Sequence, residues 1–279
     1  MVIDFHSHVF PEAIAEKALS HIEETDECHR VTNGTMKDFQ ENIQNSGVNL
    51  SILLPVATSP KQFETINKVA LGYNEKYDNV LSFGGAHPLS NHWKEELKEI
   101  KSMGFKGIKM HPDCQDTPLD SEESIRFIDY AAQLGLVNVI HTGFDPNYHG
   151  STNCDPRAIR NLLDALGEDI PNLVLAHLGG LDFHPEDIDL ICDSKVYFDI
   201  ACYNFIPIKD DLIQKIVKRH GADKIVFGSD CPWSDPKSDI ERILTYDLSD
   251  EEKDKIFYKN ALKLLKMKEE DIKVKSYAF

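Results

Sequence analysis

Eight short apolar segments recur along the chain, and helical patterns separate most of them. Several segments, such as residues 173–177 and 224–228, carry apolar side chains at successive positions instead of at every second one. Such runs are typical of strands in a parallel sheet, which are buried on both faces. The eight segments are residues 2–8, 48–54, 80–84, 107–111, 137–141, 173–177, 196–200 and 224–228.

Capping residues mark several helices between these segments. Ser121 is the expected N-cap of a helix over residues 121–134, and Asp155 with Pro156 is expected to begin another. Further helices are predicted at residues 14–22, 37–45, 62–77, 93–103 and 249–268.

Alternation of strands and helices over 279 residues predicts an α/β fold, a (β/α)8 TIM barrel that forms a single domain over residues 1–279. A doubly wound open sheet is the alternative. The barrel is favoured because no Gly-x-Gly-x-x-Gly motif follows the first strand and because eight is the number of strands in a barrel.

The charge of the chain limits its partners. With 30 basic and 47 acidic residues, the formal net charge is -17. Binding to nucleic acid or an anionic membrane needs clustered basic side chains, so neither partner is expected. No apolar run approaches the roughly 18 residues of a membrane span. We therefore expect a small-molecule substrate as the main partner, with a homo-oligomer as a further possibility.

The six cysteines do not form a Cys-x-x-Cys pair, which argues against a zinc knuckle or a thioredoxin-like motif. Their even number would permit disulfides. However, the first apolar segment is preceded by no basic region and followed by no small-residue cleavage site. We expect buried, reduced thiols and a cytoplasmic location.

The first segment ends in Asp4-Phe5-His6-Ser7-His8. Side chains two apart in a strand share a face, so His6 and His8 are expected to project together, with Asp4 on the same face. Two converging imidazoles are suitable ligands for a divalent metal such as zinc. Taken alone, the His-x-His pair could equally be an accident of the surface.

Polar residues stand at the same place in most of the other repeats. Because the carboxyl ends of barrel strands converge at one mouth, these side chains are expected to lie together there. A single histidine at a strand end is more often structural, but four histidines with an aspartate favour a functional site. The strand-end residues are His6, His8, Lys109, His111, His141, His177 and Asp230. His87, which precedes a turn proline, is expected to have a structural or supporting role.

Several motifs make the chain resemble the amidohydrolase superfamily, in the branch called amidohydrolase 2. They are IDFHSH at residues 3–8, GIKMHP at 107–112, VLAHLGG at 174–180, FGSDCPW at 227–233 and the late Asn260-Ala261. They occur in the expected order over nearly the whole chain. The combination is specific for the superfamily and carries little information about the substrate.

The resemblance implies a role for each strand-end residue. His6, His8 and His141 would bind a divalent metal, and Asp230 would bind it and also accept a proton from the metal-bound water. A bound metal lowers the pKa of its water toward about 7. His177 would either act on substrate and water beside one metal or bind a second ion.

Lys109 bears on the number of metal ions. Its position resembles that of a lysine that is carboxylated in some relatives and bridges two metals. An ammonium would repel a cation, whereas a carbamate would bind it. Alternatively, Lys109 points away or binds a substrate carboxylate as an amine. The cofactor is therefore expected to be one or two divalent ions, with Zn²⁺ the leading candidate because the site is rich in histidine.

The resemblance leaves the reaction open between two classes. The first is a metal-dependent hydrolase that acts on an amide, lactone or ester; the second is a metal-dependent decarboxylase that acts on an aromatic or enoic acid. His111, Tyr203 and Trp233 are predicted to contact the substrate, and Asp230 and His177 to be catalytic. A catalytically inactive binding protein is a third reading, against which the complete ligand set argues.

Overall fold

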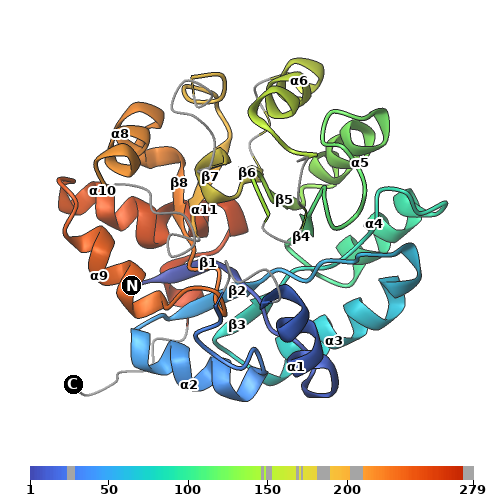
Figure 1. Cartoon of the computed structure of the whole chain (residues 1–279), viewed down its shortest axis with the longest axis horizontal. Helices are drawn as coiled ribbons and strands as arrows, with labels where there is room; N and C mark the ends of the chain where they lie inside the picture. The colour runs from blue at the N-terminus through green and yellow to red at the C-terminus, as the bar shows by residue number, and fades with distance from the viewer. Residues whose placement is uncertain are drawn as a thin grey trace.

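Eight parallel strands form the centre of the part of the chain that the structure describes, and helices surround them (Figure 1). The structure is a computed structural model that describes residues 1–23, 29–145, 148, 153–167, 170, 172–180, 189–201 and 210–272. The strands are β1 (Ile3–Ser7), β2 (Leu50–Leu53), β3 (Val80–Ser82), β4 (Gly107–Met110), β5 (Val137–Ile140), β6 (Leu173–Leu175), β7 (Tyr197–Ile200) and β8 (Ile225–Phe227). All eight predicted strands are confirmed, each somewhat shorter than expected.

The sheet closes into a barrel through two short seams. Strands β1 to β3 pair in order, and strands β4 to β8 form a second continuous run. A parallel bridge between Gly84 and Ile108 joins the two runs on one side, and a bridge between Ser7 and Cys231 joins them on the other. The predicted TIM barrel is therefore confirmed, and the open-sheet alternative is wrong.

The helices follow the predicted pattern with two additions, α8 and α9. They are α1 (Glu12–Glu23), α2 (Met36–Ser46), α3 (Phe63–Lys76), α4 (Trp93–Ser102), α5 (Glu122–Gln133), α6 (Pro156–Leu166), α8 (Asp210–His220), α9 (Pro236–Leu244), α10 (Asp250–Asp254) and α11 (Asn260–Leu265). Ser121 and Asp155 cap α5 and α6 as predicted, because each side chain accepts an N–H from the first turn. None of the described helices is long and apolar enough to cross a membrane.

The last predicted helix, over residues 249–268, is interrupted. A π-helical turn at Lys255–Lys259 separates α10 from α11. Directly after it, the buried Asn260 amide donates to the carbonyls of Ala222 and Ile225, both at 2.7 Å. A π turn inserts an extra residue into a helix and so changes the direction of the following side chains. Here it accompanies the anchoring of α11 at the start of β8.

Two layers of buried apolar side chains stabilise the barrel. One lies inside and includes Phe5, Phe83 and Val139; the other lies between strands and helices and includes Ile140 and Leu162. Cys154, Cys192 and Cys231 are buried free thiols and Cys114 is a half-buried one, as expected for reduced cysteines, whereas Cys28 and Cys202 lie outside the described residues.

Gly107 tests how tightly the inner layer is packed. A Cβ at this position would overlap the ring of Phe83 and lie 2.5 Å from the carbonyl oxygen of Val137, which belongs to the β4–β5 ladder and cannot move freely. We expect Gly107→Ala to lower the free energy of unfolding by about 2–3 kcal/mol, measured by urea denaturation. Gly72→Ala is the matched control.

Gly72 lies exposed within α3, and a Cβ there would meet no atom within 4 Å. Alanine should therefore raise the stability by about 0.5–1 kcal/mol through its better helix propensity. Equal effects of the two substitutions would contradict tight packing around Gly107.

Candidate metal centre

The predicted strand-end residues meet at the carboxyl end of the barrel. His6 lies in β1 with His8 just beyond it, Lys109 lies in β4, His141 follows β5, and Asp230 follows β8. His177 begins a short 3-10 turn, His177–Gly179, directly after β6. Apart from the half-buried His8, these side chains are buried. The barrel thus gathers polar groups from distant parts of the sequence into a site with little access to water.

Three of these residues, His6, His8 and Asp230, form one compact group. The Nε2 atoms of His6 and His8 lie 3.1 Å apart, which confirms that the two imidazoles project together. Asp230 Oδ1 is 3.2 Å from His8 Nε2 and 3.5 Å from His6 Nε2. The ligand atoms of these three residues all lie within 4.8 Å of one another.

The other ring nitrogens indicate what this group can bind. His8 Nδ1 is 3.0 Å from the carbonyl oxygen of Leu54, which can only accept a hydrogen bond. His6 Nδ1 is 2.8 Å from the carboxylate of Asp199. With neutral rings, both Nε2 lone pairs would then face the Asp230 carboxylate. Three acceptors this close need a shared proton or a cation between them, so the donor set fits a divalent metal.

The charge states agree with this fit. Burial lowers the pKa of His6 well below its usual value and also lowers the pKa of His177, which favours neutral imidazoles. Burial alone would raise the pKa of Asp230, but the imidazoles of His6 and His8, which share a proton with it when no cation is bound, outweigh burial and hold that pKa below its ordinary range. A carboxylate beside neutral imidazoles is the combination that zinc and manganese sites use.

His177 and His141 extend the site away from this group. His177 Nε2 lies 3.1 Å from His141 Nδ1, and the rings of His177 and His6 are 5.1 Å apart. His141 Nε2 is buried and has no hydrogen-bond partner among the described residues. A buried polar atom without a partner is unfavourable, so an additional ligand at this nitrogen would relieve a real cost.

Lys109 faces the same site. Its side chain is 1% exposed, and its Nζ atom lies 3.1 Å from His6 Nε2. Burial lowers the pKa of Lys109, although the nearby carboxylates of Asp199 and Asp230 oppose this shift. The alternative that Lys109 points away from the histidines is therefore wrong.

His111 lies beside the group as a second layer. Its ring stacks on that of His141 at 3.9 Å with an interplanar angle of 6°, and its Nε2 atom is 3.1 Å from Asp145 Oδ2. Burial would lower the pKa of His111, but Cys114 and Asp145 outweigh it and raise the pKa to about 9. Gln115 accepts the His111 backbone N–H and fixes the loop. The mouth therefore carries a cationic imidazole at neutral pH.

Asp4 has a role different from that of the histidines. The pairing of β1 with β2 shifts register between Asp4 and Ser7, which breaks the regular alternation of side chains that the sequence predicted. The Asp4 carboxylate accepts hydrogen bonds from the hydroxyls of Ser7 and Ser229 and from the backbone N–H groups of His6 and Ser229. Asp4 therefore ties β1 to the loop after β8 and lies outside the imidazole group, where it supports the strand ends.

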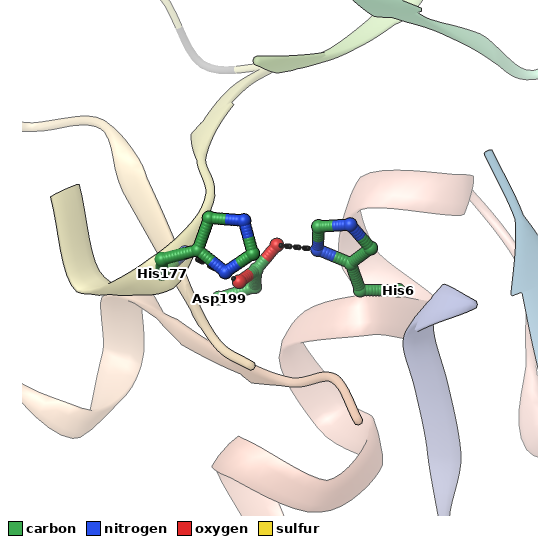
Figure 2. A group of neighbouring side chains, drawn as sticks. All are labelled: His6, His177 and Asp199. Atoms are coloured by element: carbon green, nitrogen blue, oxygen red, sulfur yellow. Dashed lines mark hydrogen bonds and ion pairs between the residues drawn. The ribbon is translucent and has the colours of Figure 1, made fainter. Parts of the chain in front are cut away.

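Asp199 was missed by the sequence analysis. It lies in β7, is fully buried, and contacts both His6 and the backbone of His177 (Figure 2). A signal was available, because a charged residue within an otherwise apolar strand is rarely buried unless it is paired. Its ring partner, His6, is 193 residues away in the sequence, and only the fold identifies it.

The backbone is strained at two of the site residues. Asp230 (φ 65°) and His177 (φ 56°) adopt left-handed conformations, which are uncommon for residues other than glycine, although asparagine, aspartate and histidine adopt them more often than most. Each is held by a backbone hydrogen bond, from Asp230 N–H to the His6 carbonyl at 2.7 Å and from His177 N–H to Asp199 at 2.8 Å. Such strain costs about 1–3 kcal/mol per residue and tends to occur at functional sites.

Three other predicted positions lie elsewhere or outside the described residues. The Trp233 side chain is buried and packs with Leu19 and Phe10. Its contact with the substrate stays a prediction. Tyr203 lies outside the described residues. His87 accepts the backbone N–H of Leu89 in a turn, in agreement with a structural role.

Comparison with known proteins gives a family and a fold. The amidohydrolase family model matches residues 3–267. No curated protein matches the chain in sequence. The chain is similar in structure to a Pseudomonas putida protein assigned as a 2-pyrone-4,6-dicarboxylic acid hydrolase, with a TM-score of 0.66, 15% identity, and coverage of 95% of this chain and 97% of the other.

Two similar structures are decarboxylases. The 2,6-dihydroxybenzoate decarboxylase from Rhizobium has a TM-score of 0.69 and 15% identity, with 95% of this chain and 98% of that chain covered. A dihydroxybenzoic acid decarboxylase from a Polaromonas species, with bound manganese and the inhibitor 2-nitroresorcinol, has a TM-score of 0.71 and 16% identity, with 98% and 99% covered. At these identities the likeness concerns the fold.

The role of Asp4 can be tested with a pair of substitutions. Asp4→Ala leaves two buried N–H groups without an acceptor, so we expect it to lower the stability of the metal-free protein by about 3 kcal/mol in urea denaturation. Asp4→Asn should cost less, because its carbonyl still accepts both N–H groups and the serine hydroxyls can rotate to accept from its amide. Equal losses would show that the charge of Asp4, and not its hydrogen bonding, holds the two strand ends.

Proposed function

Because the chain belongs to the amidohydrolase family, we propose that it is a metal-dependent hydrolase that acts on an amide, lactone or ester of a small molecule. The observation that carries this proposal is the convergence of His6, His8 and Asp230, whose acceptor atoms lie 3.1–3.5 Å apart. Members of this family are metal-dependent enzymes that include both hydrolases and decarboxylases. The family assignment does not distinguish these two reactions, and hydrolysis is our proposal.

The proposed ligands are His6, His8, His141 and Asp230, with His177 beside them. Zinc suits a site of imidazoles and one carboxylate. Manganese is the alternative, because the Polaromonas decarboxylase structure contains it. The buried His141 Nε2, which has no partner among the described residues, supports including His141 in the ligand set.

In the proposed reaction, Asp230 and His177 have different roles beside the metal ion. When bound, the ion would lower the pKa of a bound water and polarise the substrate carbonyl. Asp230, held as a carboxylate next to His8, would accept the proton of the attacking water and deliver it to the leaving group. Neutral His177 would orient the carbonyl, because the Asp199 hydrogen bond fixes its backbone.

The chemical form of Lys109, free amine or carbamate, would determine whether the site holds one metal ion or two. An unprotonated lysine amine that adds to carbon dioxide forms a carbamate and releases one proton. The Nζ atom lies 3.1 Å from His6 Nε2, so a carbamate at this position would lie beside the proposed ligand set as an anionic bridge. We propose this form for the hydrolase.

A decarboxylase is the second candidate, and His111 is the observation that favours it. The pKa of its imidazole is raised to about 9, so a cation lies at the mouth beside His141. Such a cation would hold the carboxylate of an aromatic or enoic acid next to the metal. Turnover of a panel of lactones, esters and amides, set against carbon dioxide release from hydroxybenzoic and enoic acids, separates the two reactions.

The metal content of the protein tests this proposal directly. Protein purified without added metal should contain one or two equivalents of zinc or manganese by elemental analysis, and a chelator should abolish turnover until either ion is restored. Growth with ¹³C-bicarbonate should give a carbamate NMR signal that disappears in Lys109→Gln. Absence of bound metal after reconstitution would reject the proposal, whereas one ion and no carbamate would assign Lys109 as a free amine.

Asp230→Asn tests the proposed proton transfer. The amide cannot accept a proton, so kcat should fall by about 10²–10⁴-fold, while elemental analysis still finds most of the metal. Asp235→Asn is the matched control, because Asp235 caps α9 and asparagine caps helices equally well. Near-normal turnover by Asp230→Asn would rule out the proposed proton transfer.

A further inference from the structure

We propose that Asp199 is a positioning residue that sets the ring protonation of His6 and the backbone position of His177 through its two carboxylate oxygens. The inference rests on the proposed metal site and deepens it, because Asp199 is assigned no direct contact with the metal or the substrate. Asp199 lies in β7, between β6, which leads into His177, and β8, which leads into Asp230. Its place in the barrel therefore allows it to reach two separate parts of the site.

The first contact determines which nitrogen of His6 can bind a metal. Asp199 Oδ2 lies 2.8 Å from His6 Nδ1. A carboxylate can only accept, so the ring proton stays on Nδ1 and the lone pair stays on Nε2. His6 Nε2 is the atom that faces His8, Asp230 and Lys109. Asp199 thus directs the lone pair of His6 toward the proposed metal.

The second contact holds the start of the turn after β6. Asp199 Oδ1 accepts the backbone N–H of His177 at 2.8 Å. His177 and Leu178 both have positive φ angles, 56° and 53°, and such a backbone is maintained only where the surroundings impose it. The hydrogen bond supplies part of that constraint and places the His177 ring beside His141 and His6.

The same contacts argue against Asp199 as a metal ligand. The ligand atoms of Asp199, His6 and His177 lie close enough to hold an ion. However, each oxygen of Asp199 already accepts a hydrogen bond, one of them on the Nδ1 side of His6 (Figure 2). An ion bound to His6 Nδ1 would displace the hydrogen bond between that ring and Asp199. The carboxylate–histidine–metal arrangement, in which the acid acts through the ring, accounts for all of these distances.

A purely structural role does not explain the choice of residue. Asp199 is fully buried among apolar strand residues, and burying a carboxylate is costly unless its partners compensate. Both of its described hydrogen bonds go to residues of the proposed metal site and none to the apolar core. The carboxylate is therefore best explained by what it does to His6 and His177.

Asp199→Asn is the decisive variant. The asparagine carbonyl can still accept the His177 N–H, but its amide faces His6 Nδ1 as a donor and drives the ring proton to Nε2. We expect zinc and manganese to bind about 10–100-fold more weakly in calorimetric titrations, with little change in the thermal stability of the metal-free protein. Asp239→Asn, which alters a buried carboxylate that accepts a serine hydroxyl, is the matched control and should bind metal normally.

A second measurement needs neither metal nor activity. In metal-free protein labelled with ¹⁵N-histidine, the His6 signals, assigned by comparison with His6→Gln, should report a proton on Nδ1 in the wild type and on Nε2 in Asp199→Asn. A wild-type ring protonated on Nε2 would overturn the proposal even if the variant failed to fold.

The outcomes separate this inference from the proposed function. Wild-type protein that binds no metal, yet carries the His6 proton on Nδ1, would reject the metal-dependent function and keep the role of Asp199. Unchanged metal affinity in Asp199→Asn would overturn the positioning role alone. Loss of one of two ions, with the other bound at normal affinity, would make Asp199 a ligand and also overturn it.

Discussion

The contact between the first and last strands is the constraint on which the rest of the site depends. His6 and His8 come from the first ten residues, whereas Asp230 lies far along the chain. They meet because Ser7 pairs with Cys231 and because Asp4 accepts hydrogen bonds from Ser229 across the same seam. A barrel that failed to close would separate the two histidines from the carboxylate. The proposed metal centre therefore depends on closure of the barrel at this seam.

The electrostatic design of the site follows from burial. In a buried environment neutral imidazoles are favoured, and the low pKa of His6 reflects that preference. The carbonyl of Leu54 and the carboxylate of Asp199 then occupy the outer nitrogens of His8 and His6. Lone pairs are left facing an anionic Asp230, an arrangement that is unfavourable without a positive charge between them. A cation bound between these groups would relieve that repulsion.

Much of the fold and of the proposed site can be read from the sequence. The apolar runs gave all eight strands because a parallel barrel buries both faces of each strand, and Ser121 and Asp155 marked helix starts through local capping chemistry. The π turn at Lys255–Lys259 was not predicted, because the anchoring of Asn260 depends on carbonyl groups more than thirty residues away. Local sequence patterns identify helices and strands, whereas hydrogen-bond acceptors far away in the sequence determine where a helix is interrupted.

The sequence by itself determined the barrel, the amidohydrolase resemblance and the strand-end histidines, because hydrophobic periodicity and strand direction are local properties. Only the tertiary structure decided which groups those side chains meet. In the folded protein the side-chain alternation of β1 is interrupted, and Asp4 accepts a hydrogen bond from Ser229. Asp199 forms hydrogen bonds with the His6 ring and the His177 backbone. These contacts join residues that lie far apart in the chain, and a hydrogen bond between them exists only once the barrel has closed.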